Sequence, residues 1–217
     1  MDIIKKMDFG GNMLQFTGIN TFVSEEDMNG ESVIRVVKAK KINNYDENTY
    51  AKALNIEFHN GIIEADMLSR LLPDAPDFAR GFIGIAFRIA EDDSRFESFY
   101  LRPTNSIHAT DDPVRQSHGC QYFSYPGYTF EYFREHGITK YEASIHNELN
   151  RWIHLKAVIE DANALFYLDH EENPTLTVNG LLHGADAHGS VGLFVDIGTE
   201  GFFKNLVIRT KSRKENR

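Results

Sequence analysis

Short apolar and aromatic runs, separated by clusters of Gly, Asn and Asp, recur along the whole chain and constrain its fold more than any other feature. Runs rich in β-branched and aromatic residues between turn residues predict β-strands. No amphipathic helical segments alternate with them, which argues against βαβ units and favours an all-β protein. The predicted strands are Ser32–Lys38, Leu54–Phe58, Gly61–Leu68, Phe82–Ile89, Phe96–Leu101, Gln121–Ser124, Trp152–Ile159, Ala164–Leu168, Leu176–Val178, Val191–Val195 and Phe202–Ile208.

Two turns and one helix complete the predicted pattern. Asn60-Gly61 predicts a tight hairpin between Leu54–Phe58 and the strand that follows, because both residues tolerate positive φ. Asp161-Ala162-Asn163 predicts a second turn. The segment Thr129–His136 predicts one short helix that stops at Gly137.

The composition predicts a single folded domain. With 217 residues and 41% hydrophobic residues, the chain is long and apolar enough for a sizeable core. The predicted strands run on without a linker, so one domain over 1–217 is expected, with residues 209–217 as a basic C-terminal tail. A net charge of −9 argues against a nucleic-acid partner, whose phosphates need Lys and Arg.

The same sequence disfavours a membrane protein and a secreted one. No apolar run approaches the ~20 residues of a membrane helix. Cys120 is the single cysteine, so no internal disulfide forms, and the first residues lack an apolar leader. A cytoplasmic location is therefore expected.

Six segments of the chain together resemble a known superfamily. They are 60–66 (NGIIEAD), 81–88 (GFIGIAFR), 96–105 (FESFYLRPTN), 140–142 (KYE), 152–156 (WIHLK) and 201–206 (GFFKNL). In this order they resemble the concanavalin A-like lectin/glucanase superfamily, in particular its uncharacterised bacterial single-domain branch, which is related to laminin G-like and keto-glycoside-hydrolase-like domains. The resemblance spans about residues 10–208 and implies a jelly-roll sandwich of two antiparallel sheets, with ligands on the concave face.

This resemblance implies three kinds of function. Lectin-like recognition of a carbohydrate, or of a related polyhydroxylated molecule, is the first expectation. Cleavage of a glycosidic bond is the alternative, and laminin G-like protein interaction is a second one. A deep pocket with Glu97 or Glu142 would favour the enzyme, and a shallow aromatic groove without carboxylates the lectin. A filled concave face with apolar rim loops would favour the interaction domain.

The glucanase motif of this superfamily is incomplete here. Retaining glucanases carry Glu-X-Asp-X-Glu or Glu-X-Asp-X-X-Glu on one strand, because two carboxylates must share a face. Glu64-Ala65-Asp66 begins such a motif, but Leu68 and Ser69 stand where its last carboxylate belongs. The sequence therefore argues against a glucanase of that type.

A cluster of arginines and tyrosines in the middle of the chain predicts the ligand-binding site. Strand alternation places Arg88, Tyr100 and Arg102 on one sheet face. Guanidinium forks bind sugar oxygens and aromatic rings stack on sugar C–H faces, so Arg102→Ala or Tyr100→Ala should abolish binding without unfolding. In the alternative interpretation, Glu97 and Glu142 neutralise these arginines in a salt-bridge lattice. Further candidate binding residues in the next segment are Arg115, Gln121 and Tyr122.

Catalysis would require a titrating pair of side chains. Glu97 with Glu142, or His118 with either glutamate, would serve as general acid and base if the fold brought them together. The segment His183–His188 and the set His108, Asp111 and Asp112 lack the spacing of a known zinc motif. No metal ligand or cofactor is therefore assigned, although relatives of this fold often hold a structural Ca²⁺.

Overall fold

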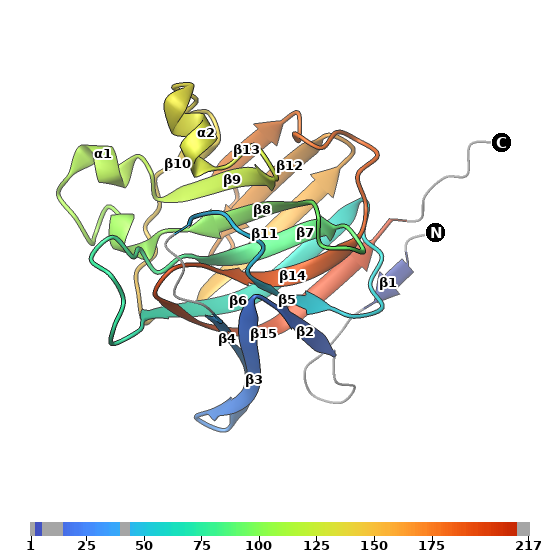
Figure 1. Ribbon diagram of the computed structural model, residues 1–217, viewed down its shortest axis with the longest axis horizontal. Coiled ribbons are helices and arrows are strands. Elements are labelled where there is room, and N and C mark those ends of the chain that lie inside the picture. The colour runs from blue at the N-terminus through green and yellow to red at the C-terminus, as the bar shows by residue number, and fades with distance from the viewer. Residues whose placement is uncertain (1–2, 6–14, 40–43, 212–217) are drawn as a thin grey trace.

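The computed structural model describes residues 3–5, 15–39 and 44–211, and it shows two antiparallel β-sheets packed face to face (Figure 1). The predicted all-β sandwich is confirmed. Sheet A runs in the order β13 (Leu176–Asn179), β12 (Asn163–Leu168), β11 (Ile153–Glu160), β6 (Gly61–Leu71), β15 (Thr199–Thr210), β4 (Glu31–Lys38) and β3 (Thr21–Met28), with β1 (Ile3–Lys5) also paired to β15. Sheet B runs in the order β10 (Glu142–Ala143), β9 (Cys120–Tyr125), β8 (Phe96–Leu101), β7 (Ile83–Ile89), β14 (Ser190–Val195), β5 (Tyr50–Ala53) and β2 (Phe16–Ile19).

The two sheets differ in how much of each faces water. In β11 of sheet A, buried residues alternate with partly exposed ones, as expected for a strand with one face on the core. In β7, β8 and β14 of sheet B, every residue is buried. The centre of sheet B therefore has something packed on both of its faces.

Residues 44–49, here called the covering segment, lie across the outer face of sheet B. This segment joins β4 to β5 and passes in front of sheet B in Figure 1. The Tyr45 ring lies 6.0 Å from that of Phe82, and the Thr49 hydroxyl donates to the Val195 carbonyl at 2.6 Å. The broad open concave face implied by the resemblance is therefore filled at its centre.

The hairpin predicted at Asn60-Gly61 is wrong. Residues 54–58 form no strand, and β5 and β6 belong to different sheets, so the chain crosses between sheets here. Gly61 is needed instead for a close approach, since a Cβ there would lie 1.9 Å from the Arg209 carbonyl oxygen. The predicted turn at Asp161 is confirmed, because Glu160 and Asn163 pair across it.

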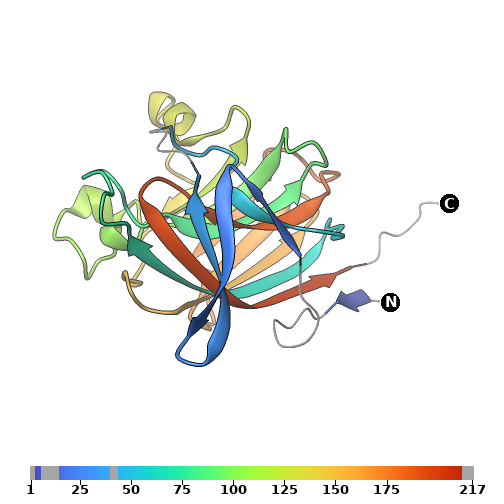
Figure 2. The same cartoon turned by 60° about the horizontal axis from the view of Figure 1, so that its bottom comes forward.

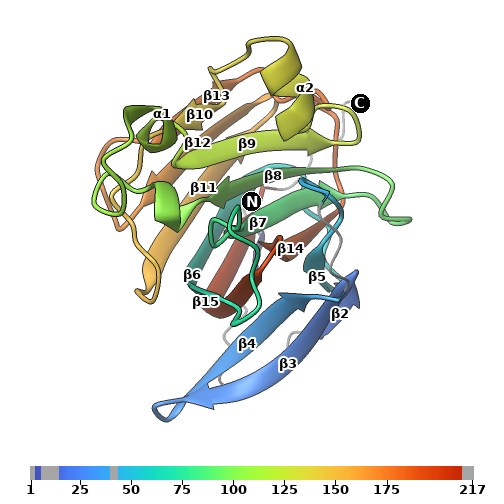
Figure 3. The same cartoon turned by 60° about the vertical axis from the view of Figure 1, so that its left-hand side comes forward.

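The predicted helix is confirmed as α2 (Phe130–Glu135), with Thr129 at its N-cap. Two shorter helical turns were not predicted, η1 (Pro103–Asn105) and α1 (Pro113–Gln116). All three lie at the same end of the molecule as β9 and β10 (Figure 3).

The β3–β4 hairpin extends away from the sandwich, as Figure 2 shows. Its first strand was not predicted, because Ser24-Glu25-Glu26-Asp27 reads as a polar turn region. At the other end of the chain, β15 continues through Arg209 and Thr210, so the expected basic tail begins later than predicted. Its residues 212–217 lie outside the described part of the chain. Within the described ranges, no helix has the length and apolar character needed to span a bilayer.

Candidate functional site

Arg88 does not share a sheet face with Tyr100 and Arg102, so that expectation is wrong. The pairing of β7 with β14 shifts at this point, with Val191 opposite Phe87 and Ser190 opposite Ile89. Arg88 is the extra residue of this bulge and has a φ of 54°. A bulge breaks strand alternation, and it turns the Arg88 side chain to the inner side of sheet B.

Arg88, Glu97 and Tyr122 form a buried cluster between the two sheets. The Arg88 Nη1 and Glu97 Oε2 atoms lie 3.6 Å apart, and both side chains are fully buried. The Tyr122 hydroxyl donates to Glu97 Oε1 at 3.1 Å. Arg88 also donates to the Asp161 carbonyl at 2.7 Å, at a turn of sheet A. The cluster therefore ties the sheets together at one end, and no ligand on the outer face reaches it.

A second polar cluster lies on the outer face of sheet B, at the end near α1 and α2. Arg102 Nη1 and Arg134 Nη2 each donate to Glu142 Oε1 at 2.9 Å. His118 Nδ1 lies 2.9 Å from Glu142 Oε2. Arg102 also donates to the Tyr100 hydroxyl at 2.8 Å and to the Gln121 side-chain oxygen.

The two glutamates considered for catalysis lie on opposite faces of sheet B. Glu97 pairs with Phe87 on the inner face, whereas Glu142 pairs with Gln121 on the outer face. The predicted Glu97–Glu142 and Glu97–His118 pairs are therefore wrong. The His118–Glu142 pair is formed.

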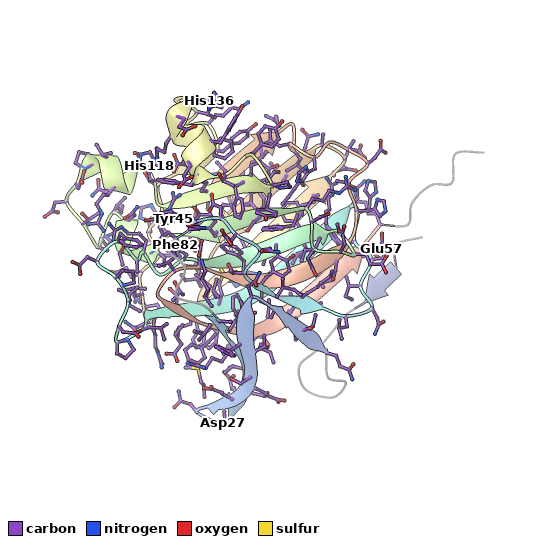
Figure 4. All side chains as sticks on the ribbon, in the orientation of Figure 1. Asp27, Tyr45, Glu57, Phe82, His118 and His136 are labelled. Atoms are coloured by element: carbon purple, nitrogen blue, oxygen red, sulfur yellow. The ribbon has the colours of Figure 1, made fainter. Side chains whose placement is uncertain are left out.

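A pocket of about 190 Å³ opens at this end of sheet B, and we call it the arginine pocket. Figure 4 labels three of its lining residues, Tyr45, Phe82 and His118, which lie in the same region of the molecule. No carboxyl side chain occurs among its described lining residues. The lining comprises the aromatic residues Tyr45, Phe78, Phe82 and Phe130, the basic residues Arg80, Arg102, Arg115, Arg134 and His118, and also Asn105 and Val114.

Local structure fixes two of these arginines. Arg115 lies in α1, whose first amides are capped by the Asp112 carboxylate, and its Nε donates to Asn105 Oδ1 at 3.1 Å. Arg80 lies just before β7 and donates through Nη1 to the Asp77 carbonyl at 2.8 Å. The Thr104 amide donates to the Arg80 carbonyl at 3.3 Å, which links the two backbone segments.

The covering segment contributes Tyr45 to the pocket lining and carries a buried carboxyl group at Asp46. Asp46 accepts a hydrogen bond from the amide of Phe130, the first residue of α2, so it joins the segment to the helix. Burial and the nearby Asp196 raise the pKa of Asp46 to about 7, while Arg102 opposes the shift. Burial also lowers the pKa of His118, an effect partly opposed by Glu142.

The structure gathers some predicted site residues and adds others. Arg102 and Arg115 line the pocket, and Tyr100 and Gln121 lie buried beneath Arg102. The sequence pattern did not mark the pocket's four aromatic residues, Arg80 or Arg134 as site residues. No motif marks them, because they come from two loops, the residue before β7 and helix α2, which lie far apart in the sequence.

The incomplete glucanase motif lies on the other sheet and faces solvent. Glu64 and Asp66 alternate with fully buried residues of β6. Asp66 lies 2.7 Å from His154 Nδ1, and Glu64 pairs with Arg209. Both carboxylates of the motif therefore already have partners on the outer face of sheet A.

The remaining candidate motifs do not converge on a metal. Within the described ranges, no group of three or more His, Cys, Asp or Glu side chains is arranged to hold a metal ion. His183 Nε2 contacts the Tyr125 carbonyl at 2.8 Å, whereas His188 lies near Glu57. Cys120 is fully buried, and burial raises the pKa of its thiol to about 12, as expected of an inert core residue.

Comparison with solved structures shows which class of fold this is. No protein-family model matches the chain, and no curated protein matches its sequence. The carbohydrate-binding module CBM66 from Bacillus subtilis superposes with a TM-score of 0.56 at 13% identity, over 89% of this chain and 97% of that module. A Bacillus subtilis protein of unknown function with a galectin-like fold superposes with a TM-score of 0.52 at 8% identity, over 91% of this chain and all of that one (100%). The chain thus has the β-sandwich fold of these proteins.

Proposed function

We propose that the protein binds a carbohydrate and that one sugar ring enters the arginine pocket. The observation that carries this proposal is the meeting of four aromatic rings with four guanidinium groups in one pocket. Aromatic faces pack against the C–H groups of a sugar, and guanidinium groups donate paired hydrogen bonds to its oxygens. The fold similarity to a carbohydrate-binding module supports the same proposal.

The size of the pocket favours a single ring. Drug-sized ligands occupy clefts of ~300–1,000 Å³. The arginine pocket, at about 190 Å³, is smaller. The covering segment also blocks the centre of sheet B, where a long saccharide would otherwise lie. We therefore propose recognition of one terminal residue of a glycan.

Binding without cleavage is the better supported form of this function. Glycosidases place two carboxyl groups on either side of the scissile bond. The described lining offers none, and Glu142 beneath it is already bound by Arg102 and Arg134. Exposed large apolar side chains, which an interaction domain would gather on its rim, occur in the described residues at Phe22, Leu71, Val114 and Tyr128, in separate segments.

A glycan array followed by titration calorimetry of the hits tests this proposal. We expect Phe78→Ala to weaken binding of a hit at least tenfold, about 1.4 kcal/mol, because the side chain lines the pocket. Tyr128→Ala is the matched control, since Tyr128 is an exposed aromatic residue outside the lining. Mass spectrometry of each bound saccharide reports cleavage. The proposal would be contradicted by the absence of binding to every glycan, by an equal loss of affinity in the two variants, or by cleavage of a bound saccharide.

A further inference from the structure

The lining of the arginine pocket holds more positive charge than the lining itself neutralises. Its described lining contains four arginines and no carboxylate. Glu142 lies behind the lining and pairs with Arg102 and Arg134. Arg80 and Arg115 form no ion pair with any carboxylate in the described part of the chain. Two guanidinium charges therefore face the pocket without a counter-charge of their own.

Both of these arginines retain unused hydrogen-bond donors. Arg80 uses only Nη1, which donates to the carbonyls of Asp77 at 2.8 Å and Ala79 at 2.9 Å. Its Nε and Nη2 groups, which form one edge of the guanidinium, bind no described residue. Arg115 uses Nε and Nη2, on Asn105 and Thr104, and leaves Nη1 free of described partners. The backbone contacts hold both side chains in place while donors remain for a ligand.

The positive charges of these arginines also repel one another. Arg80 is half-buried, and burial, together with the nearby Arg115 and Arg102, lowers its pKa. Holding like charges together at a partly dry site costs free energy unless an anion offsets it. A carboxylate fits the donor set, because its two oxygens match the edge of a guanidinium.

We propose that the bound sugar is acidic, a hexuronate at the end of a glycan, and that Arg80 and Arg115 bind its carboxylate. This inference rests on the proposed carbohydrate function and narrows its ligand class. The aromatic wall distinguishes a sugar acid from a free inorganic anion, since Tyr45, Phe78 and Phe130 give a small ion nothing to pack against. Arg80 and Arg115 are then the residues that determine specificity.

The test compares acidic and neutral sugars that differ only at C6. The probes are the methyl glycosides of glucuronate and galacturonate against those of glucose and galactose, titrated by calorimetry or NMR. We expect at least one uronate to bind on the order of 10- to 100-fold tighter than its neutral partner, as charged hydrogen bonds of this kind imply. This preference should disappear in Arg80→Gln and Arg115→Gln. It should persist in Arg95→Gln, which removes an exposed arginine outside the lining.

Arg80→Lys keeps the charge but loses the planar edge, and it should retain only part of the preference. Thermal melting checks that each variant is folded. Equal binding of neutral and acidic sugars, or a preference that survives both glutamine variants, overturns this inference and leaves the carbohydrate function standing. If sulfate or acetate binds as tightly as the uronate, the pocket recognises a small anion, and the assignment of a sugar acid is overturned. If no glycan on the array binds the protein, the proposed function itself is contradicted.

Discussion

Asp46 carries a buried carboxyl group in the covering segment, outside the pocket lining, and its titration should be visible in the stability of the protein. Its pKa is raised from 3.8 to about 7 by burial and by Asp196. Between about pH 4 and about pH 7, the folded protein therefore holds a proton that the unfolded chain has lost. Stability from this group is complete below about pH 4 and falls as the pH rises through 7.

Asp46→Asn removes this dependence. We expect the free energy of unfolding of the variant, relative to the wild type, to increase with pH between about 4 and 7 and then to level off. Urea denaturation at a series of pH values measures the difference. Asp186→Asn, which changes an exposed aspartate, is the control. A wild-type-minus-variant difference that is flat across this range would contradict the raised pKa.

Arg102 is a structural residue as much as a binding one, and its burial revises the expected effect of removing it. Only 3% of the residue is exposed, and its guanidinium contacts Glu142, Tyr100 and Gln121. Arg102→Ala would leave Glu142 buried with fewer partners. We expect it to destabilise the protein by roughly 3–5 kcal/mol, as for other broken buried ion pairs.

Arg134→Ala is the matched comparison, since Arg134 binds the same Glu142 oxygen while its side chain is 34% exposed. Its cost should be clearly smaller, because water replaces an exposed partner. Urea denaturation of both variants separates the two cases. Equal losses would show that burial of Arg102 does not determine its contribution. Arg102→Ala therefore cannot report on ligand binding unless its fold is verified.

At the scale of elements, the crossing from β5 to β6 depends on Gly61. This residue has a φ of 145°, and a Cβ would meet the Arg209 carbonyl oxygen at 1.9 Å. Gly61→Ala should therefore separate the start of β6 from the end of β15 and lower the melting temperature. Gly30→Ala is the control, since Gly30 also has positive φ (85°) but nothing within 4 Å of a Cβ. If both variants lost the same stability, the loss would come from backbone strain alone, at roughly 1 kcal/mol each. The close approach at Gly61 would then contribute nothing.

The strands of the core could be predicted from the sequence, because their apolar residues recur with the spacing that a buried face requires. The strands β7, β8, β11 and β14 lie where the pattern placed them to within one or two residues. The pattern failed for β3, because its run of acidic residues is typical of a turn. It also failed for residues 54–58, where apolar residues fill a crossing between sheets rather than a strand.

The pocket could be predicted only in part, for a related reason. Arg102 stood out because it directly follows a clear strand, and Arg115 because it lies in the segment that leads to the next strand. Strand alternation placed Arg88 wrongly, because a single-residue bulge cannot be seen in side-chain spacing. Arg80 and Tyr45 lie in loops, and their position depends on contacts between residues far apart in the chain, which a pattern of neighbours does not contain.

At the scale of the whole molecule, burial on both faces should make the centre of sheet B the most stable part of the fold. Amides of β7, β8 and β14 have no solvent-facing side and should exchange hydrogen slowest, with free energies near that of global unfolding. The amides of β3, in which every residue except Thr21 is exposed or partly exposed, should exchange fastest among the long strands. Hydrogen-exchange mass spectrometry measures this order. Fast exchange in β8 would show that the covering segment opens readily.

The projecting strand β3 ends sheet A and offers its outer backbone edge to any other extended chain. Three consecutive acidic residues, Glu25, Glu26 and Asp27, occupy this edge near the tip of the hairpin, where Figure 4 labels Asp27. Antiparallel pairing of two such edges would set six carboxylates close together. We therefore expect this negative charge to oppose edge-to-edge pairing of two hairpins, and so to oppose the growth of a continuous intermolecular sheet.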